Sequence, residues 1–153
     1  MAERHVTRVR QLLARKNTGQ IGVLPDDTVL KALEVMAESN IGAVLVLDGE
    51  RLVGIFSERD YARKVELKGR TAVATHVKDL MTTELVTVSS DETVEECNVL
   101  MRQHHIRHLP VIENGKLVGV LSSRDVLTEV VADEEKDIKS LEIERRLVES
   151  GLY

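Results

Sequence analysis

Two short segments of the chain carry the same chemically useful residues in the same order. The first holds Ser57, Arg59 and Asp60, and the second holds Ser122, Arg124 and Asp125. An apolar run precedes each serine and helix-type spacing follows it, so each motif is expected where a strand ends and a helix begins. A helix N-terminus, a hydroxyl and a guanidinium all suit a phosphate, whereas an aspartate accepts from hydroxyl pairs such as those of ribose. Each segment is therefore a candidate site for the ribose-phosphate part of a nucleotide.

A purely structural interpretation of the same residues stays open. Ser-x-x-Asp is typical of a capping box, in which the serine oxygen accepts a backbone N–H and the acid reaches back to the cap residue. Capping explains the serine and the aspartate of each segment. It does not explain an arginine at the same place in both.

The two motifs belong to a duplication. A shift of 65 positions aligns residues 26–60 with residues 91–125 without a gap, and 12 of the 35 aligned positions are identical. Leu52-Val53-Gly54, for example, recurs as Leu117-Val118-Gly119. A single copy of about 60 residues could bury little, so the copies are expected to pack face to face about a pseudo-two-fold axis.

Each copy reads as strand, helix, strand, strand, helix. In copy one we expect a short strand around Ile21 and Val23, a helix capped by Asp26 or Asp27, a strand over 43–47, a return strand over 52–56 and a helix over 57–67. In copy two we expect a strand around Val86 and Val88, a helix over 91–103, strands over 108–112 and 117–121, and a helix from Ser122. Asp48-Gly49 and Asn114-Gly115 are hairpin signals.

The ends of the chain differ from the repeat. The spacing of Val9, Leu12 and Leu13 resembles that of Val77, Leu80 and Met81, so each copy is expected to carry a short helical lead-in. We assign residues 6–70 to repeat one, 71–132 to repeat two and 133–153 to a charged helical tail.

Composition excludes several classes of function. The 153 residues have a formal net charge of −5, which will not draw the protein to nucleic acid. Three aromatic rings and no tryptophan also remove the stacking platforms of single-strand binders. No segment approaches the roughly 18 apolar residues of a membrane span, and the charged N-terminus has no signal-peptide core. A cytoplasmic location without nucleic-acid or membrane partners follows as the expectation.

Other reactive residues give weaker signals. Cys97 is the only cysteine and fits a helix face as a small apolar side chain. His104, His105 and His108 cluster in the sequence, but no further residues have metal-ligand spacing, so we expect no metal site. Serine-hydrolase, Walker and dinucleotide-binding motifs are missing, which argues against an enzyme.

The chain resembles a tandem pair of CBS (cystathionine β-synthase) domains over roughly residues 6–132. The resemblance rests on the duplication, the Gly-x-x-Ser-x-Arg-Asp element, the lead-in Val77-Lys78-Asp79-Leu80-Met81-Thr82 and the stretch Ile106-Arg107-His108-Leu109-Pro110-Val111. It implies an α/β (α+β) fold of two βαββα repeats, a Bateman module, with the helical lead-in and the charged C-terminal helix added. Family members usually form homodimers and bind adenosine nucleotides in clefts between the two copies.

Residue roles follow from that resemblance. Asp60 and Asp125 would hold ribose hydroxyls, and phosphate would be faced by Ser57, Arg59, Ser122 and Arg124. Ile21, Val23, Val86 and Val88 would wall the adenine. Arg107 and His108 stand where family members place basic residues toward phosphate, whereas copy one has Gly42 and Ala43 there, so the two sites are not expected to be equivalent.

The resemblance implies a non-catalytic regulatory module with no required cofactor. Its ligand would be AMP, ADP, ATP or a dinucleotide such as NAD, and it would signal by a change of shape or of dimer geometry to a regulated protein that the sequence does not name. The alternative is a structural protein–protein interaction module with no physiological nucleotide.

Overall fold

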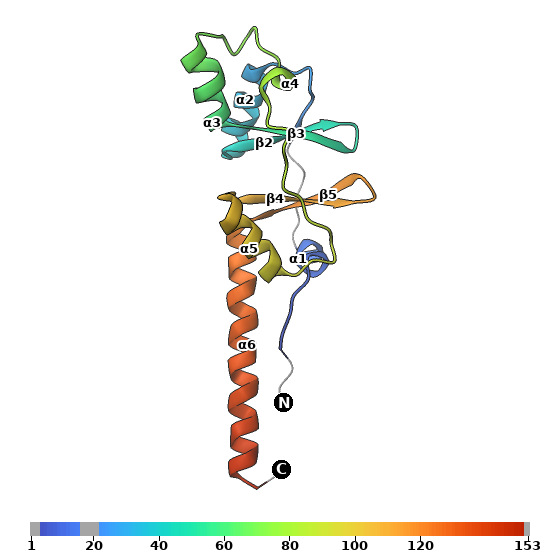
Figure 1. The fold of residues 1–153 in the computed structure, drawn as a ribbon, viewed down its shortest axis with the longest axis vertical. Helices are drawn as coiled ribbons and strands as arrows, with labels where there is room; N and C mark the ends of the chain where they lie inside the picture. The colour runs from blue at the N-terminus through green and yellow to red at the C-terminus, as the bar shows by residue number, and fades with distance from the viewer. Residues whose placement is uncertain (1–3, 16–21, 152–153) are drawn as a thin grey trace. The chain divides into compact units, whose positions relative to one another are not determined.

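The computed structural model describes residues 4–15 and 22–151 (Figure 1). In chain order the elements are α1 (Val9–Arg15), β1 (Gly22–Val23), α2 (Val29–Ser39), β2 (Ala43–Asp48), β3 (Arg51–Ser57), α3 (Glu58–Asp60), the π-helical turn η1 (Tyr61–Val65), the 3-10 turn η2 (Glu66–Lys68), α4 (Val77–Leu80), α5 (Val94–His104), β4 (His108–Glu113), β5 (Lys116–Ser122) and α6 (Ser123–Glu149). The strand–helix–strand–strand–helix order expected for each copy is confirmed, apart from the first strand of copy two.

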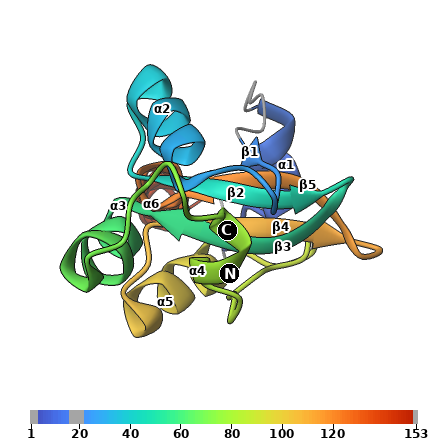
Figure 2. The same ribbon diagram turned by 90° about the horizontal axis from the view of Figure 1, so that it is seen from above.

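The chain divides into two compact units. Unit 1 contains Met1–Thr18, Thr87–Glu113 and Val118–Tyr153, and unit 2 contains Gly19–Val86 and Asn114–Leu117. In unit 2 the three strands lie in the order β1-β2-β3, and α2, α3 and α4 lie on the same side of them (Figure 1). Seen from above, α3 begins at the end of β3 that is opposite the β2–β3 turn (Figure 2).

The sheet of unit 2 buries an aliphatic core around one aromatic ring. β1 runs parallel to β2, with Val23 opposite Val46, and β2 runs antiparallel to β3, with Val44 opposite Phe56. Phe56 is fully buried, and Val29 and Met36 of α2 pack in the same cluster. Removing such side chains from water is the main favourable contribution to folding in a chain with so few rings.

The helix caps differ in one detail from the sequence expectation. Thr28, and not Asp26 or Asp27, caps α2, because its hydroxyl accepts the N–H of Lys31 at 3.1 Å. The carboxylate of Asp27 instead accepts the N–H of Leu24 at 2.8 Å. The two aspartates therefore predicted the start of the helix to within two residues, but not which side-chain oxygen caps it.

Copy two has no full counterpart of β1, so the expected strand around Val86 and Val88 is wrong as a strand. Val88 forms one isolated parallel bridge to Val111: its N–H donates to Pro110 and its carbonyl accepts from Ile112. The next bond of a parallel ladder would need a donor on Pro110 toward Val86, and proline has no N–H. Copy one has Leu45 at the matching place, and there β1 forms.

Each lead-in helix packs on the copy that it does not precede. α4 precedes copy two but belongs to unit 2, where the N–H of Val77 donates to Asp27 at 2.9 Å. α1 precedes copy one but belongs to unit 1, where the N–H of Val9 donates to Glu92 at 2.8 Å. Each compact unit therefore contains the lead-in helix that precedes the other copy in the sequence.

A glycine in each return strand lies close to the exchanged lead-in. A Cβ built on Gly54 would lie 2.5 Å from Sδ of Met81 and 3.1 Å from the carbonyl oxygen of Thr82. A Cβ built on Gly119 would lie 2.6 Å from a methyl of Leu13. At Gly54 a backbone atom as well as a side chain occupies this space, whereas at Gly119 the nearest atoms all belong to the flexible side chain of Leu13.

The tail expected over residues 133–153 is helical through Glu149, and it continues α6 without a break at residue 133. Two buried carboxylates of α6 accept hydrogen bonds from the N-terminal segment of unit 1. Thr7 donates its N–H to Asp133 at 2.9 Å and its hydroxyl to Glu129 at 3.1 Å. Among the described helices, none is both long enough and apolar enough to cross a membrane.

We predict that Gly54→Ala lowers the free energy of unfolding by about 1–3 kcal/mol, because the added methyl group overpacks the contact with Met81 and the backbone of Thr82. Gly42→Ala is the matched control, since its Cβ would meet only a carboxylate oxygen of Glu58 at 3.9 Å. Chemical denaturation of both variants measures the difference. Equal stability of the two would contradict the packing role of Gly54.

Candidate functional site

The first motif forms a complete capping box in unit 2. The Ser57 hydroxyl accepts the N–H of Asp60 at 3.1 Å, and the Asp60 carboxylate accepts the N–H of Ser57 at 2.9 Å. The structural interpretation of these two residues is therefore confirmed. It does not exclude a ligand, because the second carboxylate oxygen of Asp60 points to other groups.

That second oxygen brings together two residues outside the motif. Lys64 places its Nζ 2.9 Å from Oδ1 of Asp60 and donates to the carbonyl of Leu80 at 3.0 Å. Thr82 donates its hydroxyl to the same Oδ1 at 3.4 Å. Asp60 is 9% exposed, so its contacts are largely shielded from water. The result is a small polar cluster at the start of α3.

Neither Thr82 nor Lys64 is among the site residues expected from the sequence. Thr82 is placed by a backbone bridge to Ile55, with N···O distances of 2.8 and 3.0 Å. Its signal was present in the sequence, because it ends the lead-in segment. Nothing in the sequence showed that this lead-in packs beside the first motif and not the second.

The second motif forms the start of α6 in unit 1. The Ser122 hydroxyl accepts the N–H of Asp125 at 3.1 Å, as in the first motif. The N–H of Ser123 donates to the carbonyl of Arg107 at 2.8 Å. Arg107 therefore lies against the same helix N-terminus as Ser122 and Asp125, and its side chain is exposed.

The cationic residues expected to face phosphate are distributed unequally. In unit 1, Arg107, His108 and Arg124 are all exposed around the start of α6. In unit 2, Arg59 is exposed beside the start of α3. The N–H of Glu58, the first residue of this helix, donates to the carbonyl of Gly42. Copy one therefore lacks the basic side chains that copy two carries at positions 107 and 108.

Two further differences separate the sites. The 65-residue shift matches Lys64 with Glu129, whose carboxylate lies 3.1 Å from Arg15 and accepts from Thr7. The lead-in alignment matches Thr82 with Ala14, which has no hydroxyl. Asp60 therefore lies close to a cation and a hydroxyl. The residues matched to these two in copy two, Glu129 and Ala14, supply neither group.

The apolar residues expected to contact adenine have three different placements. Val23 is buried in β1 and Val88 is buried at its bridge to Val111. Val86 is half-buried and lies outside any strand. Ile21 lies outside the described residues. Contact of any of them with a base stays a prediction.

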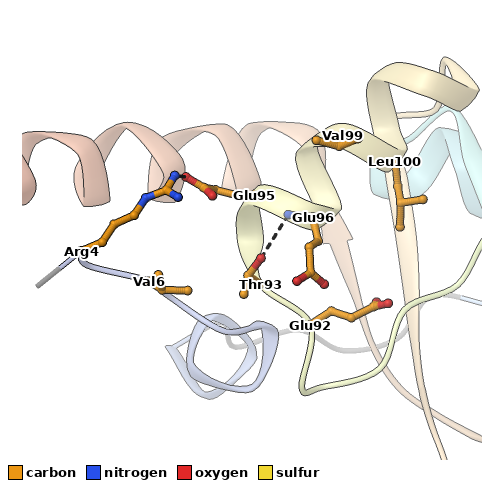
Figure 3. A pocket seen from close by; sticks show the side chains of 8 residues that line it. All are labelled: Arg4, Val6, Glu92, Thr93, Glu95, Glu96, Val99 and Leu100. Carbon is orange, nitrogen blue, oxygen red and sulfur yellow. Dashed lines mark hydrogen bonds and ion pairs between the residues drawn. The ribbon is translucent and has the colours of Figure 1, made fainter.

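A separate open cavity of about 630 Å³ lies in unit 1 (Figure 3). Its charged lining comes from Arg4, which is ion-paired with Glu95, and from the carboxylates of Glu92 and Glu96. Thr93 caps the helix beside it by accepting the N–H of Glu96 at 3.2 Å. This acidic lining does not suit a phosphate, and none of the sequence-predicted site residues contributes to it.

The remaining reactive groups have structural surroundings. Cys97 is fully buried, and burial together with nearby Glu92 raises the pKa of its thiol to about 12. His105 is the left-handed C-cap of α5 and His104 ends that helix. Within residues 4–15 and 22–151, no three His, Cys, Asp or Glu side chains gather as metal ligands.

Comparison with known families now assigns the fold. The model of the CBS domain matches residues 6–67 and again residues 77–132. The chain belongs to the CBS-domain family. The expected α/β fold of two CBS repeats followed by a C-terminal helix is thereby confirmed.

The CBS-domain relatives cover most of this chain. CBS domain-containing protein CBSX3, mitochondrial, of Arabidopsis thaliana is 38% identical over 121 residues, which are 76% of this chain and 59% of that protein. The chain thus spans about three fifths of the length of that relative. A CBS-domain protein of Burkholderia ambifaria superposes with a TM-score of 0.75 at 43% identity, covering 83% of this chain and 96% of the other.

A further solved structure contains a nucleotide. The CBS domain protein PAE2072 of Pyrobaculum aerophilum, in complex with AMP, superposes with a TM-score of 0.70 at 25% identity. The superposition covers 82% of this chain and 99% of that one.

We predict that Ser122→Ala lowers the free energy of unfolding by about 1 kcal/mol, because it removes the oxygen that accepts the N–H of Asp125. Ser123→Ala, one residue further on, retains that cap and is expected to change stability far less. Thermal or urea unfolding of the two variants checks the difference. A Ser123→Ala variant that is as unstable as Ser122→Ala would contradict the capping role.

Proposed function

We propose that this CBS-domain protein is a non-catalytic regulatory module that binds an adenosine nucleotide at the starts of α3 and α6. The carrying observation is the contact of 2.8 Å between Ser123 and Arg107, which gathers exposed cationic side chains at the N-terminus of a long helix. A helix N-terminus with nearby guanidinium groups is a strong phosphate-binding arrangement. The AMP complex of the Pyrobaculum relative supports the same class of ligand.

The unequal surroundings suggest a division of roles. The phosphate is bound in unit 1 by Arg107, His108 and Arg124, and ribose hydroxyls are bound by Asp125. In unit 2 the residues at the places of Arg107 and His108 are Gly42 and Ala43, which carry no basic group. The start of α6 is therefore the tighter phosphate site. The choice among AMP, ADP, ATP and NAD, the homodimer and the cytoplasmic location stay predictions.

The structural alternative has one observation in its favour. The family match ends at residue 132, whereas α6 continues to Glu149 with exposed apolar side chains. A module whose role is only to hold another protein would keep the same melting temperature when nucleotides are added. A nucleotide sensor instead gains stability by mass action when its ligand is in excess.

We predict that Arg107→Ala weakens AMP binding by about tenfold or more, because a hydrogen bond to a charged group contributes roughly 1.5–3 kcal/mol. Isothermal titration calorimetry on nucleotide-stripped full-length protein measures the affinity, with ATP and NAD titrated in parallel. The matched control is Arg102→Ala, which removes an exposed arginine from the last turn of α5.

Two results would contradict the proposal. Wild-type protein that binds none of the three nucleotides would favour the interaction module. Equal AMP affinity in the Arg107→Ala and Arg102→Ala variants would remove Arg107 from the site. A melting temperature measured for each variant ensures that loss of binding is not loss of fold.

A further inference from the structure

An exposed stripe on α6 has the spacing of a coiled-coil seam. Val131, Glu134, Ile138, Leu141, Arg145 and Val148 follow one another at alternating intervals of three and four residues. Such alternation keeps side chains on one face of a helix that winds around another helix. We call these six residues the α6 seam.

The apolar members of the seam face solvent in unit 1. The exposed fractions are 44% for Val131, 56% for Ile138, 57% for Leu141 and 64% for Val148. The buried residues of α6, which include Val126, Val130 and Asp133, are a different set. The helix therefore packs in its own unit through residues 126–133, and no residue from Glu134 to Glu149 is buried there. Family similarity does not explain this face, because the family match ends at residue 132.

The charges in the seam indicate what covers it. In an antiparallel pair of α6 helices, pairing residue 138 with residue 141 of the second copy also places Glu134 opposite Arg145 and Val131 opposite Val148. Two-fold symmetry repeats each pair, so one register gives two ion pairs and four apolar pairs. A parallel pair would instead stack Glu134 on Glu134 and Arg145 on Arg145. Like-charge layers of this kind are unfavourable, so the charge pattern selects the antiparallel arrangement.

The surroundings of the seam are compatible with this pairing. A shallow depression of about 440 Å³ beside Val131 is lined by Leu127, Ala132 and Glu135 among others. In the antiparallel register the partner's Val148 reaches this depression. Arg145 contacts Glu149 of its own helix at 2.8 Å, but a guanidinium has five N–H donors and can bind a second carboxylate.

We propose that the α6 seam pairs with the α6 seam of a second copy of this chain as an antiparallel coiled coil. The seam is flanked by acidic side chains, Glu135, Asp137, Glu142 and Glu144. The pairing uses no residue of the nucleotide site and is independent of whether a nucleotide binds.

Charge reversal tests the register on the full-length protein. Glu134→Arg alone places arginine against Arg145, and Arg145→Glu alone places glutamate against Glu134, so each single change weakens self-association at least tenfold. The double reversal restores opposite charges and is expected to return within about threefold of wild type. Sedimentation equilibrium measures the association. Single reversals that leave it unchanged, or a double reversal that fails to restore it, would overturn the proposal.

Spin labels test the orientation. The two-fold axis falls between residues 139 and 140, so labels on Ser140→Cys lie about 10 Å apart across the pair, whereas labels on Ser150→Cys lie about 30 Å apart at 1.5 Å of rise per residue. Buried Cys97 is not expected to take up label. Close labels at both sites would show a parallel pair. Undetectable coupling at both sites would show an unpaired helix or one covered by another protein, and either of these two results would overturn the proposal.

Discussion

The fold of each unit depends on the close approach of a lead-in segment to a return strand. At Gly54 and again at Gly119, the space that a Cβ would occupy is filled by a side chain of the exchanged lead-in. This contact allows Thr82 to bridge Ile55, and the bridge brings the Thr82 hydroxyl to Asp60. The first polar cluster therefore exists because a backbone position carries no side chain. The glycine of Gly-x-x-Ser-x-Arg-Asp thus serves packing, while the serine and aspartate serve the helix start.

Capping and ligand binding make compatible demands on the same residues. A capping serine fixes where the helix begins, and that beginning is also where unpaired N–H groups point outward. The Asp60 carboxylate uses one oxygen for the box and the other for Lys64 and Thr82. The serine and aspartate types are therefore explained by local structure alone. The arginines are not, because Arg59 and Arg124 are exposed on the helix starts.

Differences at matched positions make the two copies unequal. Pro110 in place of Leu45 removes a ladder donor and reduces the first strand of copy two to one bridge. Arg107 in place of Gly42 adds a cationic side chain at one helix start. At both positions the backbone carbonyl accepts the N–H of the first residue of the helix that follows the return strand. Glu129 in place of Lys64 redirects that position toward Thr7 and Arg15. The helix starts of both copies keep the serine cap despite these changes.

The sequence by itself determined the repeat, most of its elements and the two helix starts, because apolar spacing, glycine turns and serine caps are local properties of the chain. It also showed that the two copies carry different residues before their second strands, since Gly42 and Arg107 can be read directly. Only the tertiary structure decided which lead-in serves which copy, and hence that Thr82 and Lys64 meet at Asp60. Thr82 and Leu80 are distant in sequence from Asp60 and Lys64, and packing between distant segments has no local signature in the sequence. The same holds for α6, where the sequence predicted a charged helical tail but only the structure showed that the tail continues the helix of the second motif and has no buried residue after Asp133.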